Sequence, residues 1–223
     1  MRVCNCIPLS LLAFSVATTA SQLSWQSQST TLVDVLSNDE DYSLLLSLLQ
    51  RARLILTLNK LDGGTLFAPT NDAIKHADKD SLWQSLLSET HSLIPDNVQE
   101  QLRQQLFYHL LNYSLTQLPE DSSTQTQKTL HFPQLPPDSP PDEPPSSPWF
   151  PIPHGLLGDE PQRLRLASRD SSNWVGVDAF GNGGAELVEG KVAEATNGII
   201  YGIAEVLEPP ADLSEYLHDI SSS

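Results

Sequence analysis

The stretch from Gly63 to Ile74, GGTLFAPTNDAI, changes abruptly from a strand pattern to a helix pattern. Residues 65–68 form a short apolar run typical of a buried strand, and Pro69 ends that run because it lacks a backbone donor. Three residues that commonly cap helices follow at once: Thr70, Asn71 and Asp72. The sequence therefore predicts a buried strand that leads directly into a capped helix.

Further helices are predicted around this stretch. Thr31 to Asp34 has the spacing of a capping box, and Asp39 to Asp41 begins a second helix that continues through the leucines of 44–49. Another helical piece is expected at 81–87. The clearest helix runs from Val98 to Leu111 and is considered next.

Helix 98–111 carries Asn97 and Glu100 in a second capping-box spacing. Its apolar face is formed by five residues at helical intervals: Val98, Leu102, Leu106, His109 and Leu110. This spacing places His109 on the core face, half buried and hydrogen-bonded. Tyr108, one position around the helix, is then the better candidate for exposure.

Strand patterns dominate the second half of the chain. After a first short strand at 113–118, alternation recurs at 163–168, residues 174–178 favour a strand, and an apolar run at 199–207 ends at a double proline. The Asn197-Gly198 pair is a strong turn signal before that last run. Helices first and strands later indicate an α+β fold rather than alternating βαβ units.

The segment from Pro133 to Pro161 differs in kind, since it holds 11 of the 17 prolines and no lysine or arginine. Such a composition provides few backbone donors and little apolar surface, so it predicts an exposed acidic loop inserted between strands. Recognition of its proline motifs by another domain is the alternative.

The N-terminus has the pattern of a signal peptide, with Arg2, a short apolar core and small residues before Ser21. We expect residues 1–20 to be removed, and an uncleaved anchor is the alternative. Cys4 and Cys6, the two cysteines of the chain, lie in this segment. The mature protein would therefore contain no disulfide and no thiolate zinc site.

The chain is strongly acidic, with 12 basic and 28 acidic residues and a net charge of −16. Such a charge repels nucleic acid and anionic lipid and favours cationic partners. We therefore predict no nucleic-acid partner.

Three stretches, in this order, resemble the fasciclin-like domain, the module of fasciclin, periostin and the transforming-growth-factor-beta-induced matrix protein. TLFAPTNDAI (65–74) is similar to its first signature, YHLL (108–111) to its Tyr-His motif, and NGIIYGIAEVLEPP (197–210) to its second signature. The resemblance departs from the family at Tyr201, where histidine is common, and in the extra length of the proline-rich loop.

The resemblance implies a single α+β domain at 30–210, in which N-terminal helices pack on a β-sandwich or wedge and the two signature strands lie near each other. Residues 21–29 precede the domain, and the polar tail 211–223 is a candidate start of a second repeat. The resemblance ties Tyr108 and His109 to adhesion. It assigns an architectural role to the signature residues Phe67, Pro69, Thr70, Asn71, Asp72, Asn197, Gly198, Pro209 and Pro210.

Catalytic and metal motifs have little support in this sequence. It lacks a Gly-x-Ser-x-Gly elbow, and its histidines are scattered at positions 76, 91, 109, 131, 154 and 218. The acidic pairs in 78–80 and 39–41 lack the other ligands of a calcium loop, so capping or solvated charge is the better interpretation. We predict no enzyme activity, no catalytic residue, no metal site and no cofactor.

Two functions remain. The first is a secreted or cell-surface adhesion module that binds an extracellular protein, matrix or cell-wall polymer, and the alternative is a carrier of a small apolar ligand or lipid in a cleft. A filled core would favour adhesion. The lumen of a secretory compartment such as the vacuole is the alternative location.

Details of attachment follow from three local features. The chain has no Arg-Gly-Asp integrin motif, and its C-terminus lacks the hydrophobic tail of a lipid-anchor signal, so membrane anchoring is not evident. Asn112-Tyr-Ser114 is the one Asn-x-Ser/Thr sequon, which makes Asn112 the candidate glycosylation site.

Overall fold

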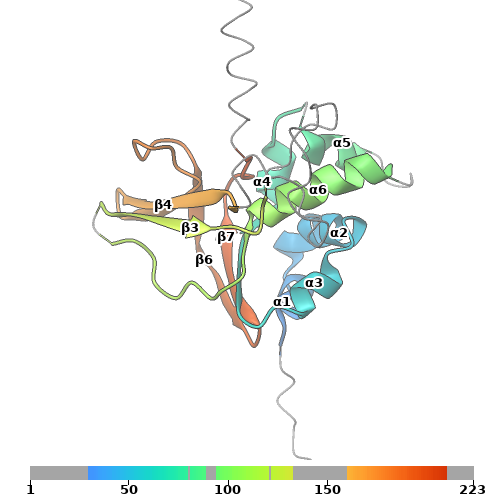
Figure 1. Cartoon of the computed structure of the whole chain (residues 1–223), viewed down its shortest axis with the longest axis horizontal. Helices are drawn as coiled ribbons and strands as arrows, with labels where there is room; N and C mark the ends of the chain where they lie inside the picture. Colours follow the sequence, from blue (N-terminus) through green and yellow to red (C-terminus); the bar gives the residue numbers. More distant parts are fainter. Residues whose placement is uncertain (1–29, 80, 89–93, 121, 133–159, 210–223) are drawn as a thin grey trace, which may run out of the picture.

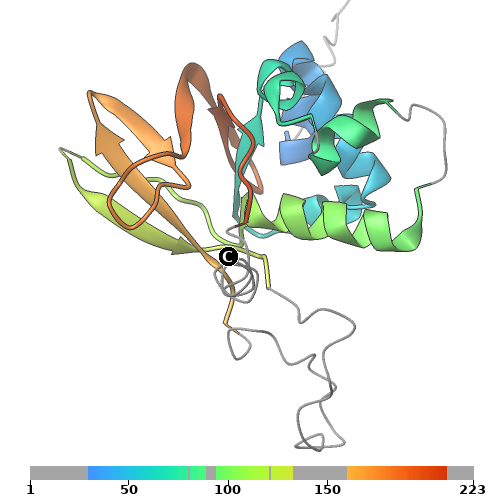
Figure 2. The same cartoon turned by 90° about the horizontal axis from the view of Figure 1, so that it is seen from above.

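The computed structural model describes residues 30–79, 81–88, 94–120, 122–132 and 160–209. Helices from the first half of the chain lie on one side of the molecule, and the strands of the second half extend away on the other (Figure 1). Figure 2 shows the same division from above, with the central strands between the helices and the outer strands. The expected α+β class is confirmed.

The described residues form the following elements in chain order. They are α1 (Leu32–Asn38), the 3-10 helix η1 (Glu40–Tyr42), α2 (Ser43–Arg51), α3 (Ile55–Asn59), β1 (Gly64–Pro69), α4 (Asn71–His76), α5 (Leu82–Ser88), α6 (Asp96–Tyr108), β2 (Leu110–Leu111), β3 (Thr124–Lys128), β4 (Arg163–Arg169), β5 (Ser172–Val175), β6 (Ala185–Ala195) and β7 (Gly198–Ile203). Within these ranges no helix is long and apolar enough to cross a lipid bilayer.

The strands form one sheet in the order β2-β1-β7-β6-β5-β4-β3. The two signature strands, β1 and β7, are adjacent and parallel, and their register runs from Gly64 opposite Gly198 to Pro69 opposite Ile203. At Gly198 a side chain is excluded, because its Cβ would lie 2.3 Å from the carbonyl oxygen of Gly64. The expected proximity of the two signatures is therefore confirmed as direct backbone pairing.

Both faces of β1 are covered, which explains why its whole length is buried and why Thr65 is its one polar side chain. Leu66 and Ala68 face the core cluster formed with the helices. Phe67 faces the opposite cluster, where its ring stacks on Tyr201 with centroids 6.0 Å apart. Successive side chains of a strand alternate between faces, so this one strand joins the two cores.

The predicted capping box of the main helix is wrong. α6 begins at Asp96 after Pro95, and no side chain caps it. Proline has a fixed φ suited to a helix start, so the first turn forms two residues earlier and places Asn97 inside the helix. The side chain of Glu100 instead accepts a hydrogen bond from Gln104 at 2.7 Å.

The chain leaves α6 earlier than predicted, and the expected strand at 113–118 is absent. Leu110 and Leu111 form β2 and pair with β1, while the following residues run as a loop. Thr65 holds this loop, since its hydroxyl donates to the carbonyl of Tyr113 at 2.7 Å and accepts from the amide of Leu115 at 2.8 Å. Side-chain hydrogen bonds thus replace a strand ladder here.

Candidate functional site

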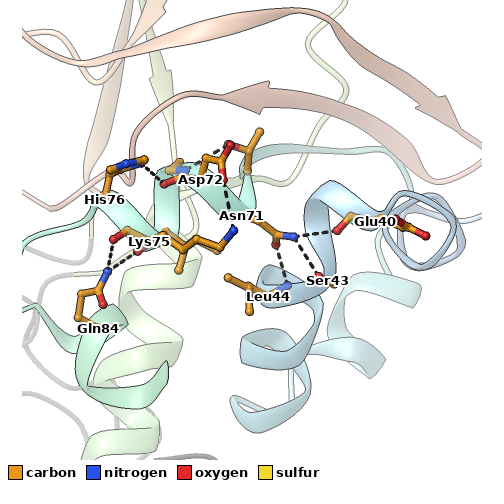
Figure 3. A network of polar contacts seen from close by, with 11 residues as sticks. Glu40, Ser43, Leu44, Asn71, Asp72, Lys75, His76 and Gln84 are labelled. Atoms are coloured by element: carbon orange, nitrogen blue, oxygen red, sulfur yellow. Dashed lines mark hydrogen bonds and ion pairs between the residues drawn. The ribbon is translucent and has the colours of Figure 1, made fainter. Parts of the chain in front are cut away.

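The first signature forms the expected strand-to-helix turn. The hydroxyl of Thr70 accepts a hydrogen bond from the amide of Ala73 at 3.2 Å and so caps α4. Asp72 forms an exposed ion pair with Lys75 at 3.3 Å, an arrangement that contributes little to stability in water. The backbone carbonyl of Asp72 also contacts Nδ1 of His76 at 2.8 Å (Figure 3).

Asn71 joins α4 to the start of α2 through both ends of its amide (Figure 3). Its Oδ1 accepts from the amide of Leu44 at 2.9 Å, and its Nδ2 donates to the carbonyl of Glu40 at 2.8 Å and to the hydroxyl of Ser43 at 3.0 Å. Tyr42 at the N-cap of α2 provides no side-chain cap. Asn71 therefore satisfies a free donor of α2 from a distant part of the sequence.

Asn197 has the same role at the other signature. Its Oδ1 accepts from the amide of Leu32 at 2.8 Å, and its Nδ2 donates to the carbonyl of Leu58 at 2.9 Å. The turn between β6 and β7 thereby holds the N-terminus of α1 and the end of α3. We call Asn71 and Asn197 clamps, because the side-chain amide of each binds backbone groups of two helical segments.

Of the signature prolines, Pro69 ends its strand, whereas β7 ends at Ile203, before Pro209. Pro69 is the last residue of β1, opposite Ile203 in the register. Pro209 is half buried after β7, and Pro210 lies outside the described residues. The predicted signal peptide 1–20 with both cysteines, the tail 211–223 and residues 133–159 of the predicted proline-rich loop also lie outside them, as do His91, His154 and His218.

His109 lies in the core with no exposed surface, at the C-cap of α6. Its Nε2 accepts a hydrogen bond from the amide of Leu207 at 3.1 Å, so Nδ1 carries the proton and donates to the carbonyl of Gln105 at 2.9 Å. The ring also meets Trp83 edge-on at 5.4 Å. Burial lowers the pKa of His109 to about 4, which keeps it neutral.

Tyr108 is buried, with 4% of its surface exposed, so its expected exposure is wrong. α6 ends at this residue and the chain turns into β2, which directs the ring toward the sheet cluster and edge-on to His131 at 6.0 Å. Burial raises the pKa of Tyr108 to about 12. Its hydroxyl has no hydrogen-bond partner among the residues that the structure describes. Asn112, the sequon residue, is exposed in the loop that follows.

A cleft of about 390 Å³ lies beside Tyr108. Its walls come from α4 and the two residues after it, from the end of α6, from the β5–β6 connection and the start of β6, and from the chain that follows β7. It is lined by Ala73, His76, Ala77, Asp78, Tyr108, Gly176, Gly184, Ala185, Glu205, Val206, Leu207 and Glu208. Three of these are carboxylates and none is lysine or arginine. Sequence reasoning missed this site because its walls are brought together only by the tertiary fold.

A second cleft, of about 620 Å³, lies over the loop after β2. Tyr201, the residue that replaces the family's common histidine, lines it and donates its hydroxyl to the carbonyl of Leu115 at 2.7 Å. This tyrosine therefore fixes a loop. Among the described residues, no three histidine, cysteine or acidic side chains are grouped so that they could hold a metal ion.

Comparison with known proteins agrees with this geometry. Residues 40–136 match the model of the family described as the fasciclin domain, a range that includes the first signature and the Tyr-His motif. The structure of a FAS1 domain pair from the insect cell adhesion molecule fasciclin I is similar with a TM-score of 0.53 and 15% sequence identity. The match covers 81% of this chain and 51% of the other, so the present chain spans about half the length of that protein. The chain thus has the FAS1 fold, and its resemblance to the fasciclin domain family is confirmed.

Proposed function

We propose that this chain is a non-enzymatic interaction module that acts in adhesion outside the cell or at its surface. The family match and the origin of the similar structure in a cell adhesion molecule support this function. Fold alone does not specify function, so the argument must rest on the site.

The observation that carries the proposal is the use of the polar signature residues. Thr70, Asn71, Asn197 and His109 all bind backbone groups of neighbouring elements. Side chains engaged in this way hold the helices against the sheet and are not free to act on a substrate. Contact with a partner therefore falls to the surface that this scaffold displays.

The alternative is a carrier of a small ligand, and the cleft beside Tyr108 has a volume in the usual range for such sites, roughly 300–1,000 Å³. Its carboxylates, Asp78, Glu205 and Glu208, disfavour an apolar ligand or lipid. Large side chains such as Trp83 and Phe67 fill the two core clusters. Adhesion is therefore the better supported function.

The partner of this module is an extracellular protein, matrix or cell-wall polymer. The signal-peptide pattern of residues 1–20 supports entry into the secretory pathway, with the lumen of a compartment such as the vacuole as the other destination. The negative charge of the chain favours a partner with cationic groups.

The test is attachment by the secreted full chain. Beads coated with the protein are mixed with cells or matrix from the source tissue, and beads coated with heat-denatured protein are the control. Adhesion predicts aggregation or attachment by the native coating alone. Equal attachment by the two coatings would contradict it, as would a lipid recovered in stoichiometric amount from a native protein that does not attach.

A further inference from the structure

We propose that the cleft beside Tyr108 binds the cationic side chain of a lysine or arginine presented by a partner protein. This inference deepens the proposed function, because it names the chemistry that an adhesive partner would bring to the molecule. It rests on the shape of the cleft, its charge, and the Tyr108 hydroxyl that opens onto it.

Small residues leave room for a side chain in this cleft. Ala73, Ala77 and Ala185 line it, together with two glycines that sit at positive φ. A Cβ at Gly184 would lie 2.6 Å from the carbonyl oxygen of Val175, so no larger residue fits there. The cleft, of about 390 Å³, therefore keeps its room because these positions carry no large side chain.

The charge of the cleft fits a cation. Asp78, Glu205 and Glu208 are exposed at its rim, and none has an ion-pair partner among the described residues. His76 is the one basic side chain in the lining, and its Nδ1 is engaged with the carbonyl of Asp72 (Figure 3). An incoming ammonium or guanidinium group would therefore meet three uncompensated carboxylates.

Tyr108 offers a hydrogen-bonding group to a ligand in the cleft. It is 96% buried, since 4% of its surface is exposed, and it lines the cleft. Its hydroxyl oxygen makes no hydrogen bond with the described residues and is not among their fully buried polar atoms, so it is open to the cleft. A cationic donor in the cleft would satisfy this oxygen, while Val206 and Leu207 offer apolar surface to the methylene stem.

The wall of the cleft is held in place before any ligand arrives. Leu207 donates its amide to His109, the residue next to Tyr108 in the chain. The Tyr-His motif thus supplies Tyr108 to the cleft, and His109 fixes Leu207, another residue of the lining. In this arrangement His109 is a positioning residue, and it does not touch the partner.

The experiment is an NMR titration of the full chain with four probes. Nα-acetyl-lysine amide and Nα-acetyl-arginine amide carry the proposed cation, Nα-acetyl-norleucine amide is the neutral match, and spermidine represents a free polyamine. We expect at least one cationic amino-acid probe to shift the backbone amides of Gly176, Gly184 and Leu207, and the norleucine probe to leave them unchanged. Equal shifts with norleucine, or shifts with spermidine alone, would overturn the proposal.

Variants locate the binding. The double variant Glu205→Gln/Glu208→Gln should weaken the cationic probe roughly tenfold, the usual result of losing two charge pairs at a surface. Tyr108→Phe should weaken it with little change in melting temperature. Glu189→Gln, an exposed carboxylate on β6 outside the cleft, is the matched control and should bind as the parent does. An equal effect at Glu189 would show non-specific attraction and refute the site.

The titration and the attachment assay fail separately. Probe binding by a protein that does not attach to cells or matrix would contradict the proposed function and leave the chemistry of the cleft supported. If the protein attaches but neither cationic amino-acid probe binds in the cleft, the proposed cation site is refuted and the proposed adhesive function is not.

Discussion

Nε2 of His109 accepts a hydrogen bond from the backbone amide of Leu207 at 3.1 Å, across 98 positions of sequence. This bond joins the end of α6 to the chain that leaves β7, and it buries a neutral imidazole without exposed surface. A residue that a sequence motif associates with adhesion is therefore part of the scaffold. The cleft beside it, at Tyr108, is the contact site that we propose for a partner.

The first prediction concerns pH. The pKa of His109 falls from 6.5 to about 4 on folding, so the unfolded chain binds the proton more tightly than the native one. The free energy of unfolding is unaffected above pH 6.5 and decreases as the pH falls toward 4, by about 3 kcal/mol in total. His131, whose pKa burial also lowers, acts in the same direction. Urea unfolding at several pH values measures this slope.

Two variants test whether His109 causes this pH dependence of the free energy of unfolding. His109→Gln should be less stable at pH 7 and should lose about 1.4 kcal/mol per pH unit from the slope between pH 6 and 5. His76→Gln, at an exposed position, is the matched control for the loss of an imidazole. A parental slope in His109→Gln would show that this histidine is not the buried neutral group.

The second prediction concerns the aromatic residue of the first signature. Phe67→Ala removes a fully buried ring of β1 from the core cluster that contains Tyr201. It should lower the free energy of unfolding by about 3–5 kcal/mol. Phe180→Ala is the matched control, because 89% of Phe180 is exposed, and it should be nearly neutral. Denaturant unfolding compares the two, and equal losses would contradict the placement of β1 in the core.

The third prediction tests the clamps. Asn71→Ala and Asn197→Ala each leave backbone groups of a helix without a partner, so each should cost about 1–3 kcal/mol. Asn59→Ala, at the exposed end of α3, should cost less than either. If Asn71→Ala and Asn197→Ala lose no more unfolding free energy than Asn59→Ala, water replaces their hydrogen bonds without penalty.

The fourth prediction is that deletion of Pro133 to Pro161, with a short Gly-Ser bridge, leaves a folded domain. β3 and β4 pair directly, with Lys128 opposite Arg163, and the amide of Gln162 donates to the carbonyl of His131 at 2.8 Å. The two ends of the loop are thus already joined by ladder-like bonds, and the exposed Lys128–Glu160 ion pair is a small loss. Circular dichroism measures folding. An unfolded deletion variant would refute the hypothesis that this segment is an insertion that the domain does not need in order to fold.

The same deletion variant also tests where binding occurs. We predict that it attaches as the parent does, because the helices, the sheet and the cleft remain. Lost attachment at an unchanged melting temperature, reproduced in the parent by high salt, would assign capture of cationic partners to the acidic loop instead.

Local sequence patterns predicted the elements whose neighbours in sequence determine them. The residue patterns correctly predicted the Thr31–Asp34 capping box, the cap at Thr70 and the two signature strands, β1 and β7. β6 was not predicted, because its ladder with β7 shifts register between Leu187 and Val192 and its alternation is interrupted there. β3 was missed as well, since its sequence TQTQK is polar on both faces.

The candidate site was less predictable from sequence. Helical spacing placed His109 in the core but exposed Tyr108, because the pattern carries no information on where α6 turns into β2. The cleft combines α4, the β5–β6 connection and the chain after β7, which are distant in sequence. No local signal marks a site of this kind.

The central claim is that the signatures hold the fold while the cleft beside Tyr108 makes the contact. The most direct measurement compares attachment of the parent with that of Glu205→Gln/Glu208→Gln, with the melting temperature of each protein recorded on the same sample. We predict that the double variant melts as the parent does and attaches much less. Full attachment by a variant of parental stability would contradict the account.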